Sequence, residues 1–241
     1  MINADAEPAN TASPSAAGLA NSDRRTVTVW SDIGCPWATL ALTTIHDLAR
    51  QRGQDLVIDH RVFPLELFNR RPTPKPLLDD EVRAVLRAVP GLGWRPWTAP
   101  EYTYPVTTLL AMEAVQACKL PEVGGVRASD ELDAALRRAF YEDSRCISVP
   151  AVILDIAELC PRVDTERLAA ALAQGASRST VYEQWKSAQR PEVQGSPHFF
   201  TPDGVDVHNP GATYHRDDQG LQLTHYDHEW ADELLTSLGS G

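Results

Sequence analysis

Apolar residues alternate with polar ones at the start of the chain and then change to a helical period. Residues 26–30 alternate as in a β-strand. From Pro36, apolar residues recur every three or four positions, which predicts a helix over 36–52 that stops at Gly53. Residues 56–62 (LVIDHRV) predict a second strand. Together these segments predict a β-α-β unit.

The pattern changes again after residue 63. Eight prolines between 64 and 105 predict turns and short pieces, and helical periodicity then runs almost to residue 192. Strand signals return at 198–200 and 205–207, and a last helix is predicted over 227–238. The interpretation is an α/β domain formed by residues 25–63 and 193–241, interrupted by a helical insertion domain, 64–192.

The first segment, residues 1–24, is rich in Ala, Asn, Ser and Pro and has no periodicity, which predicts a disordered tail. It lacks the basic start and apolar stretch of a secretory signal. No run approaches the roughly 18 apolar residues that a membrane span needs. Four scattered cysteines in a chain of 241 residues favour free thiols. These features predict a cytoplasmic protein without a membrane partner.

The formal net charge is −11 at pH 7. This charge argues against nucleic acid as a partner, because nucleic acids are bound through an excess of Lys and Arg. The 43% hydrophobic and 23% charged residues are ordinary for a globular protein. The oligomeric state stays open, with a dimer as one option.

Cys35 lies where the first strand ends and the first helix begins, with Pro36 at the first helical position. The free N–H groups of the first turn and the helix dipole favour thiolate over thiol. They therefore predict a lowered pKa and a nucleophilic sulfur. The alternative is an inert buried cysteine. A thioredoxin-type motif would have a second cysteine at position 38, where this chain has Ala38.

A second segment, residues 195–199, reads GSPHF and places Pro197 directly before an apolar strand. Proline lacks a ladder donor and belongs at the entrance of a strand, and the Ser196–Pro197 bond can be cis where the fold demands it.

These two segments give the chain a family resemblance. Residues 30–37 (WSDIGCPW) and 195–199 (GSPHF), supported by 138–148 (RAFYEDSRCIS) and 208–211 (HNPG), resemble the DsbA-like branch of the thioredoxin superfamily. That branch includes FrnE-type oxidoreductases, kappa-class glutathione transferases and 2-hydroxychromene-2-carboxylate isomerase. The resemblance covers residues 26–238 and implies a thioredoxin fold with an inserted α-helical domain.

The resemblance implies a thiol–disulfide oxidoreductase whose catalytic residue is Cys35. Because Ala38 cannot resolve a mixed disulfide, the site would be monothiol and would use a small thiol, glutathione or mycothiol, as co-substrate. No tightly bound cofactor and no metal are expected. One alternative is a small-thiol-dependent isomerase or transferase acting on a small aromatic substrate, since those relatives have serine at the position of Cys35. Another is a non-catalytic binding protein that retains the cleft.

Further residues are candidates for holding a thiol or small-molecule substrate. In the family the backbone before the cis-proline pairs with the extended substrate. The predicted substrate-binding residues are Ser31, Pro36, Trp37, Trp94, Trp97, Ser196, Pro197 and His198. Competing interpretations are helix capping for Ser31, packing of the insertion for the two tryptophans, and a turn-entry proline without a ligand role for Pro197. Cys146 is a candidate resolving cysteine, whereas Cys118 and Cys160 fall on apolar helical faces and are predicted to be core residues.

Overall fold

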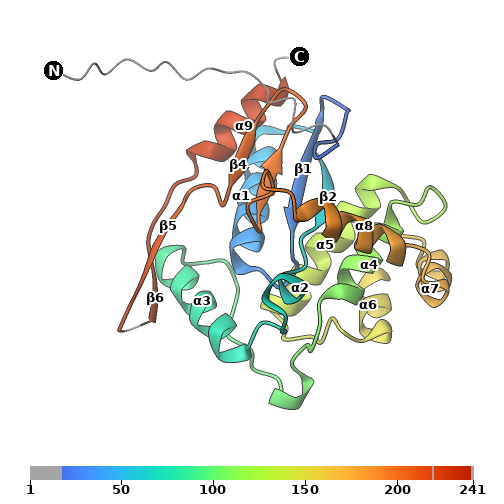
Figure 1. Ribbon diagram of the computed structural model, residues 1–241, viewed down its shortest axis with the longest axis horizontal. Coiled ribbons are helices and arrows are strands. Elements are labelled where there is room, and N and C mark those ends of the chain that lie inside the picture. Colours follow the sequence, from blue (N-terminus) through green and yellow to red (C-terminus); the bar gives the residue numbers. More distant parts are fainter. Residues whose placement is uncertain (1–17, 219, 240–241) are drawn as a thin grey trace.

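The computed structural model describes residues 18–218 and 220–239 (Figure 1). Its main sheet has the strand order β2-β1-β3-β4. Strand β1 (Thr26–Ser31) runs parallel to β2 (Val57–Val62) and antiparallel to β3 (His198–Phe200), which pairs antiparallel with β4 (Asp206–His208). Strands from both ends of the sequence therefore form one thioredoxin-like sheet, as predicted.

Two helices cover one face of this sheet. Helix α1 (Pro36–Arg52) follows β1, and α9 (Glu229–Gly239) packs against α1 near the end of the chain. Their apolar residues form a core with those of β1, β2 and β3. The opposite face is covered around Trp30 and Phe200, where Leu19 and Ala188 pack.

Seven helices lie between β2 and β3. They are α2 (Leu65–Asn69), α3 (Lys75–Ala88), α4 (Leu109–Cys118), α5 (Val126–Tyr141), α6 (Pro150–Ala157), α7 (Thr165–Gln174) and α8 (Arg178–Ala188), with a short 3-10 turn at Glu101–Thr103. They enclose the largest hydrophobic core of the described residues. Helix α5 packs directly against β2 and so joins the insertion to the sheet. The helical insertion is confirmed as an architecture, while its boundaries at 64 and 192 stay a prediction.

Helix α3 corrects the prediction that prolines break most of 64–105 into turns and short pieces. Pro74 is its N-cap residue and Pro76 lies in its first turn, where a missing N–H removes no helical hydrogen bond. Pro90 follows the helix end. The prolines therefore flank a helix of 14 residues rather than interrupt it.

A second sheet was not predicted. Strands β5 (Ala212–Asp217) and β6 (Gly220–Tyr226) form an antiparallel hairpin that lies against α3 (Figure 1). The Leu221 carbonyl accepts a hydrogen bond from Arg87 (2.9 Å), and its N–H donates to the Asp80 carboxylate (3.2 Å). The hairpin thus connects the C-terminal half of the thioredoxin fold to the insertion.

The predicted tail is wrong for its last residues. Leu19 is buried, and its carbonyl accepts a hydrogen bond from the Trp30 indole (3.1 Å). The Asn21 N–H donates to the Thr28 hydroxyl (2.7 Å). This segment is fixed because it satisfies polar groups of the sheet. The rest of the predicted tail, 1–17, lies outside the described residues. No helix in the described part of the chain combines the length and apolar character of a membrane span.

Candidate active site

Cys35 is the N-cap residue of α1, with extended backbone angles (φ −90°, ψ 113°), and Pro36 begins the helix. The Cys35 N–H donates to the Asp32 carbonyl (3.2 Å), which closes the turn after β1. The Cys35 carbonyl accepts the N–H of Thr39 (3.0 Å) as the first helical hydrogen bond. The strand-to-helix junction is confirmed, and it holds the sulfur at the start of the helix.

The proline segment meets Cys35 directly, although 161 positions separate the two in the sequence. The Ser196–Pro197 peptide bond is cis. The Cys35 Sγ–H donates to the Ser196 carbonyl (3.1 Å), and the Ser196 Oγ accepts the N–H of Asp32 (2.9 Å). Pro197 is buried, and Ser196 is half-buried. The structure therefore brings together Cys35, Ser196 and Pro197 as one site.

The pKa of Cys35 corrects the prediction of an acidic thiol. Burial raises the pKa of this thiol to about 11, because only 2% of the residue is exposed and a thiolate there is poorly solvated. A hydrogen bond with the Ser196 side chain and one from the Ala38 N–H lower the pKa by less than burial raises it. In this state the sulfur is protonated at neutral pH and donates its hydrogen to a carbonyl. Its burial is a tertiary property that the helix-start motif does not encode.

Asp32 shapes the loop that precedes Cys35. Its carboxylate accepts the N–H of Gly34 (2.8 Å) and, with the other oxygen, the N–H of Leu65 at the start of α2 (2.9 Å). Burial raises the pKa of Asp32, and these hydrogen bonds oppose that effect. The carboxylate thus ties the active-site loop to the insertion.

The sequence interpretation missed Arg137 on α5, which is 3% exposed. Its guanidinium donates to the Asp32 carbonyl (3.1 Å), the Thr39 hydroxyl (3.0 Å) and the Ser31 hydroxyl (2.9 Å). Asp133, one turn earlier on α5, holds the guanidinium at 2.6 Å. Arg137 therefore forms hydrogen bonds with the chain both before and after Cys35. The i, i+4 spacing of Asp133 and Arg137 beside the apolar stripe of this helix was the one available signal.

These contacts also assign Ser31. Its hydroxyl accepts a hydrogen bond from the Arg137 guanidinium, which gives Ser31 a positioning role, and its contact with a substrate stays a prediction.

A series of ionisable side chains continues from Asp133 and Arg137 to His46 on α1. Asp133 lies 3.6 Å from a ring nitrogen of His60, whose other nitrogen is 2.8 Å from Asp130. Asp130 also contacts His46 at 3.2 Å. Burial opposes the ionised form of Asp130, but its two histidine partners hold the pKa of this carboxyl well below its usual range. The pKa of His46 is raised, since Asp130 outweighs the effect of its burial.

The aromatic candidates have separate positions. Trp37 is half-buried and stacks on Tyr214 of β5, with ring centroids 5.0 Å apart, so the hairpin packs on the first turn of α1. Trp94 stacks on Tyr141 (4.8 Å), and Trp97 packs edge-on to Tyr104 (5.4 Å). Trp94 and Trp97 belong to the core of the insertion, which favours the packing interpretation for both. Trp94 additionally lines a cavity.

Both ring nitrogens of His198 have partners within the protein, and its role in substrate binding stays a prediction. The residue is fully buried in β3. One ring nitrogen lies 2.6 Å from the Asp206 carboxylate, and the other accepts the Gln194 N–H (3.0 Å). Burial lowers the pKa of this imidazole. His198 therefore holds β4 and the segment before Ser196 in place.

All four cysteines are free thiols. Cys118 and Cys160 are buried in the core of the insertion, as predicted. Burial raises their pKa values to about 12 and about 11. Cys146 is half-buried, and its role as a resolving cysteine stays a prediction.

Comparisons with known proteins identify the family and the fold. The family model described as a DSBA-like thioredoxin domain matches residues 26–214. No curated protein matches the chain. The fold is shared by a probable DsbA oxidoreductase from Streptomyces coelicolor, with a TM-score of 0.57 and 16% identity over 90% of this chain and 91% of that one.

Two further solved structures have the same fold. The cytosolic disulfide reductase DsbM from Pseudomonas aeruginosa, solved with GSH, has a TM-score of 0.56 and 14% identity over 89% of this chain and 99% of its own. A 2-hydroxychromene-2-carboxylate isomerase has a TM-score of 0.52 and 14% identity over 89% of this chain and 94% of that one. The family model covers most of the chain, including the Cys35 and Pro197 segments. The chain therefore belongs to the family of DSBA-like thioredoxin domains.

Proposed function

We propose that the protein catalyses thiol–disulfide exchange through Cys35 alone, with a small thiol as its partner. The observation that carries the proposal is the contact of the Cys35 sulfur with the Ser196 carbonyl, directly before cis-Pro197 (3.1 Å). A thiol at a helix start beside an extended backbone can meet the sulfur of a disulfide substrate. Ala38 occupies the position from which a second cysteine would resolve the product.

The reaction has two exchange steps. Cys35 loses its proton, and its thiolate attacks a substrate disulfide, R–S–S–R′, which forms Cys35–S–S–R and releases R′S⁻, protonated to R′SH. A small thiol, R″SH, then loses its proton and attacks the mixed disulfide, which forms R–S–S–R″ and returns the Cys35 thiol after protonation. The net change is exchange of R″SH for R′SH, so no outside oxidant or reductant is needed.

The backbone of Ser196 has a specific place in this scheme. Its carbonyl accepts the Cys35 hydrogen in the resting state. When the thiol ionises, that carbonyl loses its donor and becomes available to an N–H of an extended substrate. Such pairing would add the substrate as a short strand beside β3. Binding would thus replace the hydrogen bond that deprotonation removes.

Glutathione and mycothiol are the co-substrates that we propose. The DsbM structure, which was solved with GSH, supports a small thiol in a protein of this fold. The cytoplasm, where thiols are kept reduced, would supply such a thiol. If exchange proceeds without a small thiol, Cys146 is the cysteine that we propose resolves the mixed disulfide.

A second candidate function rests on the protonated state of Cys35. A neutral thiol that donates a hydrogen bond could stabilise a bound small thiolate, as a serine hydroxyl would in an isomerase or transferase. Under this alternative Cys35 forms no covalent bond. A protein that binds a ligand in the cleft without reaction is the third candidate. The three differ in whether Cys35 becomes covalently modified and whether serine can replace it.

Exposure of the protein to glutathione disulfide should yield one glutathionyl adduct, on Cys35. Because burial raises the pKa of Cys35 to about 11, only about 10⁻⁴ of it is thiolate at pH 7 in the free protein. The adduct should therefore form faster as the pH rises from 7 towards 11, by up to about tenfold per unit. Intact-mass and peptide mass spectrometry measure this. An adduct on Cys146 with none on Cys35 would contradict the assignment.

A further inference from the structure

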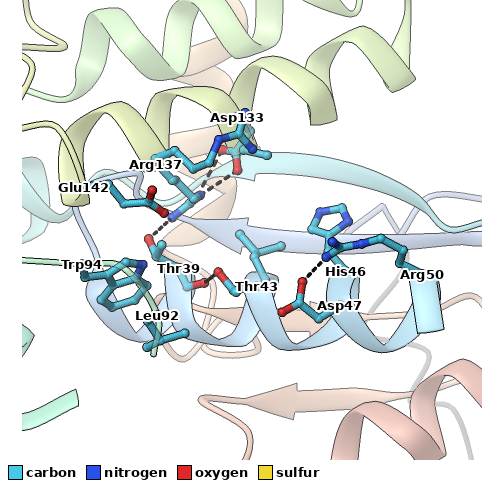
Figure 2. A pocket seen from close by; sticks show the side chains of 13 residues that line it. Thr39, Thr43, His46, Asp47, Arg50, Leu92, Trp94, Asp133, Arg137 and Glu142 are labelled. Atoms are coloured by element: carbon cyan, nitrogen blue, oxygen red, sulfur yellow. Dashed lines mark hydrogen bonds and ion pairs between the residues drawn. The ribbon is translucent and has the colours of Figure 1, made fainter. Parts of the chain in front are cut away.

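A cavity of about 410 Å³ lies between α1 and α5, and its lining does not include Cys35 (Figure 2). Thr39 and Thr43 on α1 form part of one wall, α5 forms the other, and Leu92 and Trp94 close one end. The volume falls within the range of small-molecule pockets. The thiol-exchange scheme uses no part of this space as a ligand site.

Most charged side chains around the cavity are already paired. The pairs are Asp47 with Arg50, Asp133 with Arg137 (2.6 Å), and His46 with Asp130 (3.2 Å). Two charged lining residues remain, Arg138 and Glu142, one turn apart on α5 and its C-cap. Within residues 18–218 and 220–239, neither side chain has an ion pair or hydrogen bond.

Glu142 is half-buried, so its carboxyl group is only partly exposed to water. Burial raises the pKa of this carboxyl, and Arg138 lowers it by less. The backbone of Gly93 passes close by, since a Cβ there would lie 3.5 Å from the Glu142 Cδ. The Arg95 N–H donates to the Tyr141 carbonyl (2.9 Å), which anchors this loop to the end of α5. One acid and one base therefore stand beside an apolar wall.

We propose that this cavity binds a small zwitterion with an apolar body, an α-amino acid or the equivalent head group of a γ-glutamyl peptide. The Glu142 carboxylate takes the ammonium, and the Arg138 guanidinium takes the carboxylate. Trp94 and Leu92 pack against the apolar part. The proposal goes beyond thiol exchange and does not depend on it, because Cys35 contributes no atom to the cavity.

Isothermal titration calorimetry with L-phenylalanine and with S-methylglutathione tests the proposal. Both carry the zwitterionic head group, and neither has a free thiol or a disulfide. Saturable binding of at least one is expected, and the probe that binds identifies the source of the head group. For L-phenylalanine, 2-phenylethylamine lacks the carboxylate and 3-phenylpropionate lacks the ammonium. Each should bind at least about tenfold more weakly, a difference of about 1.4 kcal/mol.

Matched variants locate the site. Glu142→Gln and Arg138→Gln should each weaken binding at least about tenfold. Asp143→Asn makes the same charge change as Glu142→Gln, on an exposed neighbour that does not line the cavity, and should leave binding unchanged. Cys35→Ser should also bind normally, which separates this proposal from the fate of thiol exchange. Thermal unfolding confirms that each variant is folded. Absence of saturable binding by both probes, or binding by the Glu142 and Arg138 variants as tight as that of the wild type, overturns the proposal.

Discussion

Replacing Ala38 with cysteine is expected to convert the protein into a dithiol oxidoreductase. Ala38 lies in the first turn of α1, fully buried, and its N–H faces the Cys35 sulfur. A cysteine there would have the spacing of a redox-active pair, whose second thiol attacks the mixed disulfide from within the chain. Because an intramolecular attack replaces a bimolecular one, release of the substrate from the mixed disulfide on Cys35 should accelerate by on the order of 10²-fold or more.

Stoichiometric reduction of a model protein disulfide by the pre-reduced variant, without added small thiol, measures this gain, because the two thiols of the variant supply both electrons. Oxidised Ala38→Cys should lose two titratable thiols, because Cys35 forms a disulfide with the introduced cysteine. Ala38→Ser is the size-matched control and should show neither effect. Overpacking at this buried position costs about 1–3 kcal/mol, so denaturant unfolding must accompany the assay. If the wild type already reduces the substrate without added thiol, another resolving cysteine exists, and Cys146→Ser should then abolish that activity.

Arg137→Met should be the most destabilising of the substitutions considered. It leaves the Asp133 carboxylate buried without its cation and removes the donors to Ser31, Asp32 and Thr39. Breaking a buried ion pair by removing one partner costs about 3–5 kcal/mol. Urea unfolding measures the loss. Arg138→Met makes the same change at an exposed neighbour and should shift stability by about 0.5 kcal/mol or less.

A double variant separates the two causes of this loss. Asp133→Leu combined with Arg137→Met removes the orphaned carboxylate, so part of the stability should return. The hydrogen bonds to the Cys35 loop stay absent, and recovery should therefore be incomplete. A loss below about 1 kcal/mol in Arg137→Met would show that the guanidinium is not required to hold the loop.

Local sequence signals were sufficient to predict the two chain junctions that form the site. Cys35 before Pro36 and Ser196 before Pro197 are junctions between elements, and each is specified by neighbouring residues. The interpretation failed where long-range packing decides. Nothing near Cys35 in the sequence shows that burial raises its pKa, and nothing near His198 shows that both its nitrogens are used within the protein.

Arg137 illustrates the same limit more strongly. It acts on a loop about a hundred positions away in the sequence, so only the packing of α5 against the sheet reveals its role. Helix α3 was missed for a different reason. Prolines were counted as breakers without regard to position, whereas those next to Lys75 stand at a helix start, where they are tolerated.

Parallel assays of Cys35→Ser and Cys35→Ala test the central claim most directly. The substrate is a mixed disulfide of glutathione, and glutathione is the added thiol. Covalent exchange requires a sulfur, so both variants should lose all exchange above the uncatalysed rate and form no adduct. If Cys35 acts only as a hydrogen-bond donor, serine should retain the activity that alanine loses. Retained exchange in folded Cys35→Ser would contradict the account.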